Sequence, residues 1–250
     1  MNEDPYRRVA GIYDRLFEPL NRGLRLLGSR MFQPEQKMRV LDVGCGTGVH
    51  LDLYRRFGCE LYGIDTSSSM LDVARDRLGE DAALCLGDAT DMPYESHTFD
   101  LVLCMLVLHE MDQRMRMSVI AEMMRVLNAN GRILLIDFHA GRARPLKGWL
   151  IKPVIFLAEL AAGRRHFHNY RHFMSTNGLP RLIENSQLTE EQRKVVAGGT
   201  LALYVVRAKY ITDQPGHACG KLATASTRTY FRLASLDQMH LSNLAIGGNT

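Results

Sequence analysis

RVLDVGCGTG, residues 39–48, is the stretch that decides the fold of this 250-residue chain. Apolar residues surround Asp42 there, which predicts a short buried strand. Three glycines follow it at once: Gly44, Gly46 and Gly48. Glycines at a strand end let a ligand approach the main chain, and Thr47 is a suitable N-cap for a helix over 48–57. A strand, a glycine loop and a helix together predict the nucleotide-binding start of a doubly wound sheet.

Strands and helices are predicted to alternate along the following residues. The predicted strands cover 59–65, 83–87, 98–111 and 132–138, and the predicted helices cover 70–78 and 113–127. Asn130–Gly131 is the predicted turn into the last of these strands. Apolar residues at helical spacing over 6–30, interrupted by Pro19, predict one or two front helices. Alternation at this pace indicates a parallel sheet with right-handed crossovers.

The remaining residues predict how the domain is completed. An apolar and basic insert covers 139–181, with a short helix predicted over 175–184. Two strands within 195–207, separated by a glycine pair, predict a terminal antiparallel hairpin. We therefore predict one α/β domain over 1–210, built on a Rossmann-like doubly wound sheet, and a poorly structured tail over 211–250.

Positive charge is concentrated in the insert. Lys and Arg exceed Asp and Glu by only four over the whole chain, so no nucleic-acid partner is expected. Over 139–181, eight basic residues accompany one acid, a net charge of +7. An interfacial helix on an anionic membrane through 142–171 and a lid over the substrate are both compatible with this pattern. The expected location is the cytoplasm, with peripheral contact at the inner membrane face under the first interpretation.

Cysteines and histidines give no metal pattern. The five cysteines lack a CxxC pair, which indicates reduced thiols rather than disulfides or zinc. Four histidines lie in the insert: His139, His166, His168 and His172. Their spacing includes no acid or cysteine partner, so we interpret them as a basic solvated face and expect no metal.

Acids stand at the ends of two further strands. Asp65 ends the second strand, placed to accept both ribose hydroxyls of a nucleoside, and Asp88 follows the third, placed to accept an adenine amino group. With the glycine loop they predict an adenosine pocket at the carboxyl ends of neighbouring strands. Each of these residues also has a structural alternative. The glycines could serve only a tight turn, Asp42 could bond loop amides, and Asp65 could cap the next helix.

These motifs together resemble the class I S-adenosylmethionine-dependent methyltransferases from about Tyr6 to Lys209. LDVGCGTG, YGID, GDATDMP, FDLVLCMLVLHEM and NANGRILLID carry the resemblance. Within that superfamily the chain is similar to the ubiquinone/menaquinone C-methyltransferase group, through IYDRLFEPLNRGL, DFHAGRARPLKGWL and GGTLALYVVRAKY. That group carries an Arg-Asn pair after strand four, where this chain has His109–Glu110. The resemblance implies a sheet of seven strands, mostly parallel with an antiparallel C-terminal strand, and S-adenosylmethionine as cofactor.

The resemblance also implies which residues contact the cofactor. They are Tyr13, Asp42, Gly44, Cys45, Gly46, Gly48, Asp65, Thr66, Asp88, Ala89 and Met105. Residues 44–48 would line its methionine and ribose part, with Asp42 near the amino group and Asp65 on the ribose. Asp88–Ala89 would contact adenine, Met105 would face the cofactor, and Tyr13 would cover it from the front helix.

Methyl transfer from a sulfonium requires few catalytic groups, because the methyl is already electrophilic. The protein needs chiefly to align the nucleophile and to exclude water. A phenol, thiol or ring-carbon acceptor benefits from a base. His109, at the end of the fourth strand, is the candidate base, and a structural loop histidine is the alternative.

The predicted function is methyl transfer to a small, hydrophobic acceptor, such as a quinol, phenol, lipid headgroup or thiol. Two other functions are alternatives for the same residues. A nicotinamide-dependent oxidoreductase would carry GxGxxG, whereas this loop is GxGxG. A non-catalytic S-adenosylmethionine-binding protein is the second.

Overall fold

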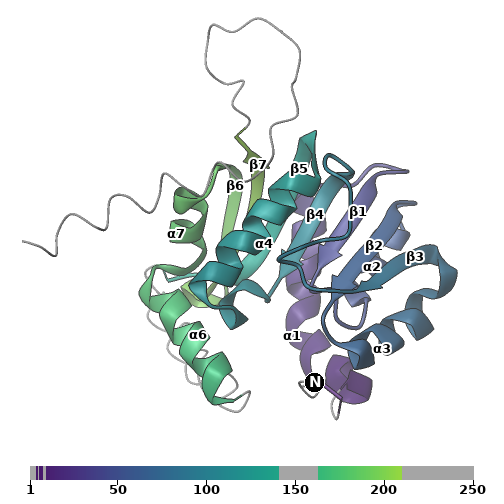
Figure 1. Cartoon of the computed structure of the whole chain (residues 1–250), viewed down its shortest axis with the longest axis horizontal. Coiled ribbons are helices and arrows are strands. Elements are labelled where there is room, and N and C mark those ends of the chain that lie inside the picture. Colours follow the sequence, from purple (N-terminus) through teal and green to yellow (C-terminus); the bar gives the residue numbers. More distant parts are fainter. Residues whose placement is uncertain (1–3, 5, 8–9, 141–162, 210–250) are drawn as a thin grey trace, which may run out of the picture. The chain divides into compact units, whose positions relative to one another are not determined.

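The computed structural model describes residues 4, 6–7, 10–140 and 163–209 (Figure 1). The predictions made for the tail over 211–250, and for the membrane or lid role of 141–162, therefore fall outside the described residues. Among the described helices, none combines the length and the apolar character needed to cross a membrane. The four described cysteines are free thiols, as predicted.

One seven-stranded sheet forms the centre of the described chain, in the order β3-β2-β1-β4-β5-β7-β6. The strands are β1 (Arg39–Val43), β2 (Glu60–Asp65), β3 (Ala82–Leu86), β4 (Phe99–Met105), β5 (Leu127–Phe138), β6 (Leu188–Val196) and β7 (Leu201–Ala208). Strands β1 to β5 pair in parallel, and β7 pairs antiparallel with both β5 and β6. The predicted fold class is confirmed.

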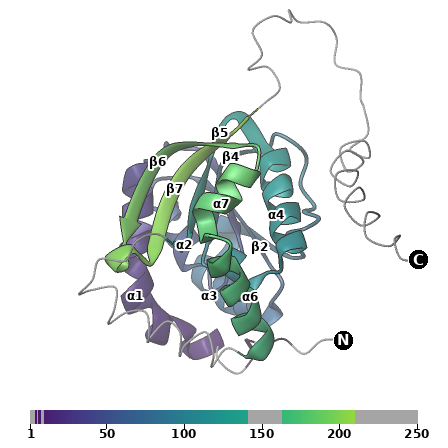
Figure 2. The ribbon, with the colours of Figure 1, turned by 90° about the vertical axis from the view of Figure 1, so that its left-hand side faces the viewer.

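Helices cover both faces of the sheet (Figures 1 and 2). They are α1 (Ala10–Met31), α2 (Val49–Arg55), α3 (Ser68–Leu78), α4 (Gln113–Val126), α6 (Arg164–Ser175) and α7 (Gly178–Asn185). Helices α1, α2 and α3 share one apolar cluster with the sheet, and α4, α6 and α7 share the other. A short 3₁₀ turn, η2 (Leu108–Glu110), follows β4.

Alternating side chains of the central strands supply both clusters. On β4, Leu101 and Leu103 belong to the α1–α3 side, whereas Val102 and Cys104 belong to the α4 side. All four are at most 1% exposed. A strand buried on both faces needs a continuous apolar run, which is why this segment is the most apolar strand of the sequence.

The start of β5 differs from its prediction. The strand begins at Leu127, directly after α4, so Asn130–Gly131 lies inside the strand and the predicted turn there is wrong. Leu127 pairs with Phe99, and a register shift separates this pair from the next one, Leu101 with Arg132. A Cβ at Gly131 would lie 3.0 Å from the Asp100 carbonyl oxygen, so glycine allows the close approach at this irregularity.

The predicted cap of the first sheet helix is also wrong. Gly48, with φ of +75°, occupies the N-cap position of α2, and no side chain caps that end. The Thr47 hydroxyl instead donates to Asp14 Oδ1 of α1 at 2.6 Å. A tertiary partner has therefore replaced the local capping bond.

The helix and the hairpin predicted towards the C-terminus are present, but their residue ranges differ from the prediction. The helix predicted over 175–184 is α7, which begins at Gly178. A further helix, α6, precedes it and was not predicted. The hairpin strand predicted from 195 starts earlier, at Leu188.

Helix α1 is a single helix that contains Pro19, which settles the choice between one and two front helices. It packs on the sheet through Gly28, where an added Cβ would lie 2.8 Å from Cδ2 of Leu134 and 3.4 Å from Cδ1 of Ile136. Both side chains are fully buried on β5. The small residue therefore sets how closely the helix approaches the strand.

Gly23 and Gly28 form a matched pair that tests this packing. Gly23→Ala meets no atom within 4 Å, so it should stabilise the helix by about 1 kcal/mol through propensity alone. Gly28→Ala forces Leu134 or the helix to move. We therefore expect the free energy of unfolding of Gly28→Ala to lie at least about 1 kcal/mol below that of Gly23→Ala. Urea unfolding followed by circular dichroism measures both, and equal stabilisation of the two variants would contradict the packing argument.

Candidate active site

The glycine loop after β1 is held in a conformation that glycine permits. Gly44 and Gly46 have φ of +73° and +52°. The N–H groups of Gly44 and Cys45 donate to the Ile64 carbonyl at 2.8 and 3.2 Å, which ties the loop to β2. A Cβ at Gly44 would lie 2.5 Å from Cγ2 of Val107, whereas a Cβ at Gly46 would meet no atom within 4 Å. The loop therefore contacts the segment after β4 at one glycine and faces open space at the other.

Asp65 organises this loop from the end of β2. Its Oδ2 accepts the Gly46 N–H and its Oδ1 accepts the Ser67 N–H, both at 2.8 Å. Burial raises the pKa of this carboxyl despite these bonds. Ser67, rather than Asp65, caps α3 by accepting the Met70 N–H at 3.1 Å, and Thr66 between them is exposed. Each Asp65 oxygen keeps a lone pair for a ligand.

Asp42 lies deeper, in the middle of β1, and is 2% exposed. Burial raises its pKa to about 8; the charge of Arg25 opposes the shift and that of Asp65 adds to it. His50 Nδ1 lies 4.0 Å from Asp42 Oδ2, and burial lowers the pKa of His50 to about 3. The Gly46 amide is bonded by Asp65, so organising that part of the loop is not the role of Asp42.

The other predicted cofactor residues surround the same strand ends. Cys45 is buried against β2, where a Cβ at Gly63 would lie 2.8 Å from its Sγ. Met105 is half-buried at the end of β4. Asp88 is exposed and its Oδ1 accepts the Thr90 N–H at 2.8 Å, while the adjacent Ala89 is buried.

Tyr13 is half-buried on α1 and its ring packs edge-on against Tyr6, with ring centroids 6.1 Å apart. Burial raises the pKa of Tyr13 to about 12, and the charges of Glu110 and Asp65 contribute. The phenol of Tyr13 is therefore near enough to acids from both β2 and the segment after β4 for their charges to raise its pKa.

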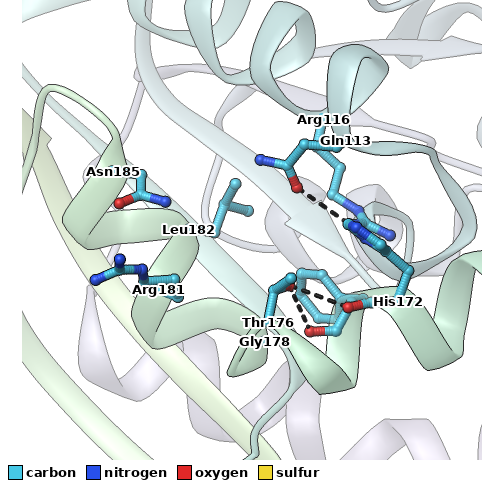
Figure 3. Close-up of a pocket in the computed structure, with 9 residues that line it drawn as sticks. Gln113, Arg116, His172, Thr176, Gly178, Arg181, Leu182 and Asn185 are labelled. Atoms are coloured by element: carbon cyan, nitrogen blue, oxygen red, sulfur yellow. Dashed lines mark hydrogen bonds between the residues drawn. The ribbon is translucent and has the colours of Figure 1, made fainter. Parts of the chain in front are cut away.

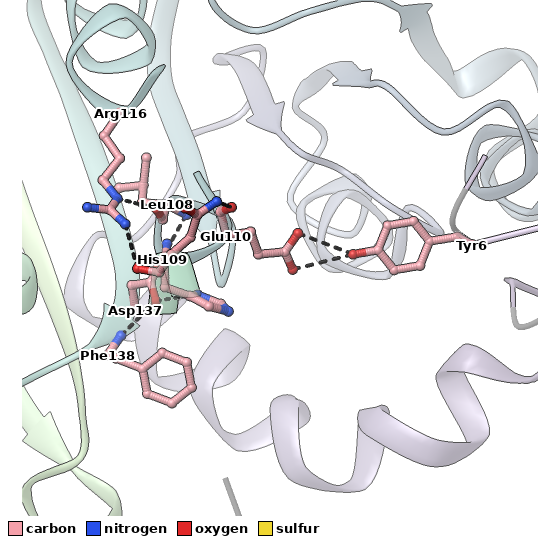
Figure 4. Close-up of polar contacts among 8 residues, drawn as sticks. Tyr6, Leu108, His109, Glu110, Arg116, Asp137 and Phe138 are labelled. Carbon is pink, nitrogen blue, oxygen red and sulfur yellow. Dashed lines mark hydrogen bonds and ion pairs between the residues drawn. The ribbon is translucent and has the colours of Figure 1, made fainter. Parts of the chain in front are cut away.

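The N-terminal segment adds two contacts that the sequence did not predict. The Asp4 carboxylate accepts the Ser67 hydroxyl at 2.9 Å and the Ser69 N–H at 3.0 Å, at the start of α3. The Tyr6 hydroxyl donates to Glu110, 3.3 Å from either carboxylate oxygen (Figure 4). Because β1 lies between β2 and β4, this segment spans the end of β1 that carries the glycine loop.

A second unpredicted link fixes the loop to α1 and α3. Asp14 accepts the Thr47 hydroxyl and pairs with Arg77, whose Nε donates to the Thr47 carbonyl at 2.9 Å. Thr47 is therefore held through both its side chain and its main chain.

His109 lies in η2, is 4% exposed and is fixed by Asp137 at the end of β5 (Figure 4). Its Nδ1 lies 2.7 Å from Asp137 Oδ1. Asp137 Oδ2 also accepts the N–H groups of Leu108 and His109, at 3.0 and 3.3 Å. An imidazole that donates Nδ1–H to a carboxylate keeps its basic lone pair on Nε2. The only sequence signal for Asp137 was another acid at a strand end.

Arg116 and Asn169 hold η2 against α6. The Arg116 side chain is fully buried; its Nε donates to the Leu108 carbonyl at 2.8 Å and its Nη2 to the Asn169 carbonyl at 2.9 Å. Asn169 Nδ2 donates to the Glu110 carbonyl at 2.6 Å. The turn that carries His109 and Glu110 is thus bonded on its main chain from β5, α4 and α6.

A cavity of about 320 Å³ lies beside Arg116, between α4, α6 and α7 (Figure 3). Its lining includes Gln113, His172, Arg181 and Leu182. None of the predicted cofactor residues lines it, so it is separate from the pocket expected at the glycine loop.

The histidine interpretation holds only in part. His168 and His172 are exposed, as expected of a solvated face. His166 is half-buried, and its ring centroid lies 5.5 Å from that of His109. The fold therefore gives His166 an acidic neighbour, Glu110, that its sequence spacing did not show.

Asp42 should make the stability of the ligand-free protein fall as pH rises. The pKa of Asp42 is about 8 in the folded protein, whereas an Asp carboxyl ordinarily has a pKa of 3.8. Between these two values the folded state therefore holds a proton that the unfolded state has lost. The free energy of unfolding then falls by at most about 1.4 kcal/mol per pH unit, and His50 contributes only below about pH 6.5.

Asp42→Asn removes this titration. Between pH 6.5 and 8, we expect the free energy of unfolding of the wild type to fall relative to that of Asp42→Asn. Urea unfolding at each pH measures both. A difference that is constant over this range would show that Asp42 is ionised in the folded protein.

Comparisons with known proteins identify the family of this chain. A family model described as a methyltransferase domain matches residues 41–135. A ubiquinone/menaquinone biosynthesis C-methyltransferase of Cupriavidus necator is 29% identical over 225 residues, covering 81% of this chain and 90% of that protein. A demethylmenaquinone methyltransferase of Thermotoga maritima is 30% identical over 185 residues, covering 70% and 78%. The crystal structure of a TehB-like SAM-dependent methyltransferase of Corynebacterium glutamicum shares the fold, with a TM-score of 0.53 at 20% identity and coverage of 80% and 98%. The chain therefore belongs to the class I S-adenosylmethionine-dependent methyltransferases, near the ubiquinone/menaquinone C-methyltransferase group.

Proposed function

We propose that this methyltransferase acts on a small, hydrophobic acceptor with an ionisable hydroxyl, of the phenol or quinol class, and that His109 is its catalytic residue. The observation that carries the proposal is the buried pair of His109 and Asp137. His109 of this pair lies two residues after Val107, whose side chain lies against the glycine loop at Gly44. The turn that carries the imidazole therefore follows directly from the segment that contacts the loop proposed to hold the cofactor.

The cofactor, S-adenosylmethionine, supplies an electrophilic methyl on a sulfonium. We propose that residues 44–48 line its methionine and ribose part, with Asp65 on the ribose hydroxyls and Asp88–Ala89 at the adenine. The open space over Gly46, next to the Asp65 carboxylate, supports this assignment. Thr66 and Met105 complete the walls of this pocket, and Tyr13 covers it from α1.

Asp42 is assigned to the cofactor ammonium. A carboxyl whose pKa burial has raised to about 8 is costly to ionise alone. A cation placed beside it would offset that cost, so binding of the ammonium would favour release of the Asp42 proton.

For the acceptor, His109 would take the proton that the hydroxyl loses as it becomes a nucleophile. Asp137 supports this role because it fixes the Nδ1–H tautomer and stabilises the imidazolium that forms. Phe138 packs edge-on against the imidazole at 4.7 Å between centroids and helps to exclude water.

The names of the relatives favour an aromatic acceptor. Those cited above are quinone-pathway methyltransferases at 29–30% identity. A malonyl-[acyl-carrier protein] O-methyltransferase of Serratia marcescens is 34% identical over 143 residues, so the wider family also methylates oxygen. His109–Glu110 stands where the quinone group has Arg-Asn, and we therefore propose a related acceptor rather than the same one. Lipid headgroups and thiols are the remaining classes to test.

Asp65→Asn should weaken cofactor binding. The carboxylate is the one acceptor that bonds the Gly46 amide and faces the ribose position, and loss of a charge-assisted bond costs about 1.5–3 kcal/mol, or roughly 10- to 150-fold in Kd. Isothermal titration with S-adenosylmethionine measures the change. Asp72→Asn, an exposed carboxylate on α3, is the control, and equal Kd values for the two variants would contradict the ribose assignment.

His109→Ala should lower kcat by about 10²- to 10⁴-fold with the cofactor Kd unchanged, because only the proton-accepting step is lost. The assay is transfer of labelled methyl to a panel of quinols, phenols, thiols and phospholipids. His168→Ala, an exposed histidine of α6, should retain wild-type turnover. Unchanged turnover in His109→Ala with normal cofactor affinity would eliminate His109 as the catalytic base.

A further inference from the structure

Three potential metal ligands meet beside the acceptor position proposed above. They are His109, Glu110 and His166, and one ligand atom of each lies within 4.8 Å of the others. We propose that these side chains bind one divalent transition-metal ion, with Zn²⁺ and Mn²⁺ as the candidate ions. Two imidazoles and one carboxylate are a common ligand set for such ions, and three protein ligands leave positions open for a substrate oxygen.

The imidazole of His109 is oriented as a ligand would be. Histidines that bind metals almost always donate their other ring nitrogen to a carboxylate or carbonyl, which fixes the ring and raises its basicity. Asp137 accepts from His109 Nδ1 at 2.7 Å, so coordination would use Nε2. The pair is almost completely buried, with side chains 4% and 1% exposed.

Glu110 is supported from outside the cluster as well. The Tyr6 hydroxyl donates to its carboxylate (Figure 4), and the Asn169 amide donates to its main-chain carbonyl. A hydrogen-bonded carboxylate is the usual condition of a ligating one.

His166 reaches the cluster because α6 is fixed to η2. It lies one turn before Asn169 on α6, and residues three apart share a helix face. Asn169 bonds Glu110, and Arg116 bonds both Asn169 and Leu108, so the helix and the turn are joined by three hydrogen bonds. The two elements that supply the ligands therefore form one framework before any ion binds.

The three ligand atoms must move closer together to coordinate one ion. Ligand atoms bound at about 2.0–2.2 Å in a tetrahedral site lie about 3.4 Å apart, which is about 1.4 Å less than the 4.8 Å within which the three atoms lie here. Rotation of the half-exposed Glu110 and His166 side chains can supply this change. None of the three is without a partner in the structure, so binding exchanges existing contacts for coordination.

The role of the ion rests on the proposed function and changes one step of it. An acceptor hydroxyl that binds at an open position gives up its proton to solvent more readily, because the cation stabilises the anion that remains. With the ion bound, His109 would be a ligand and the proton would pass to solvent, whereas without the ion His109 takes that proton as proposed above. The ionised acceptor takes the methyl, the bond between methyl and sulfur breaks, and its electron pair stays on sulfur, so charge and atoms balance.

The test is metal binding by the full-length protein after treatment with a chelator. We expect isothermal titration with Zn²⁺ or Mn²⁺ to show one site per chain. Glu110→Gln and His166→Ala should each weaken that site by about 10-fold or more. His168→Ala, on the same helix, should leave it unchanged. With Co²⁺ as probe, visible absorption reports the coordination in the absence of any acceptor.

The outcomes separate the two proposals. Absence of a one-to-one site in the wild type, or wild-type affinity in both Glu110→Gln and His166→Ala, would overturn the metal site. Because two variants are used, misfolding of one leaves the other decisive. Chelated wild type should still bind S-adenosylmethionine, and loss of cofactor binding there would count against the cofactor assignments instead.

Discussion

The hydrogen bonds of the Asp137 carboxylate hold the turn η2, on which the proposed acceptor site depends. It accepts the N–H groups of Leu108, His109 and Phe138 and the Nδ1–H of His109, and it is 1% exposed. A buried polar side chain needs hydrogen-bond partners, and four donors meet that need here. Removing the carboxylate would leave several of these donors without an acceptor in a dry interior. The position of η2, and with it His109 and Glu110, therefore follows from one side chain at the end of β5.

Three strand acids of the same sheet have different environments, and their environments separate their roles. Asp137 is surrounded by N–H donors, Asp65 is bonded by two main-chain amides, and Asp42 lies beside the neutral His50 with its pKa raised to about 8. Donors favour the charged carboxylate, whereas burial without them favours the protonated form. Asp137 is thus suited to fix a protein group, and Asp42 to meet a cation that arrives with a ligand.

The sequence was sufficient for the sheet and for the places of the glycine loop and Asp65 at its strand ends, because the signals there are local. The glycines follow β1 directly, and Asp65 ends β2, so a pattern of a few residues contains the information. The acceptor end depends on contacts between distant residues: Tyr6 meets Glu110 across 104 positions, and His109 meets Asp137 across 28. No periodicity or spacing encodes such pairs. The wrong cap at Thr47 has the same origin, because Asp14, 33 residues away, takes the hydroxyl that a local rule assigns to the helix.

The N-terminal segment joins the two ends of the site, and its bonds are of the kind that exchange readily. Burial alone would raise the pKa of Asp4, but the donors of Ser69, Tyr6 and Ser67 outweigh it and lower the pKa to about 2, so the carboxylate stays charged. Each of its hydrogen bonds, and that of Tyr6 to Glu110, contributes only about 1 kcal/mol net in a partly exposed setting. A segment held by a few such bonds can open locally at a small fraction of the cost of unfolding. Because Asp4 bonds Ser67 after β2 and Tyr6 bonds Glu110 after β4, local opening would release both contacts together, whereas the buried hydrogen bonds of Asp137 would stay in place.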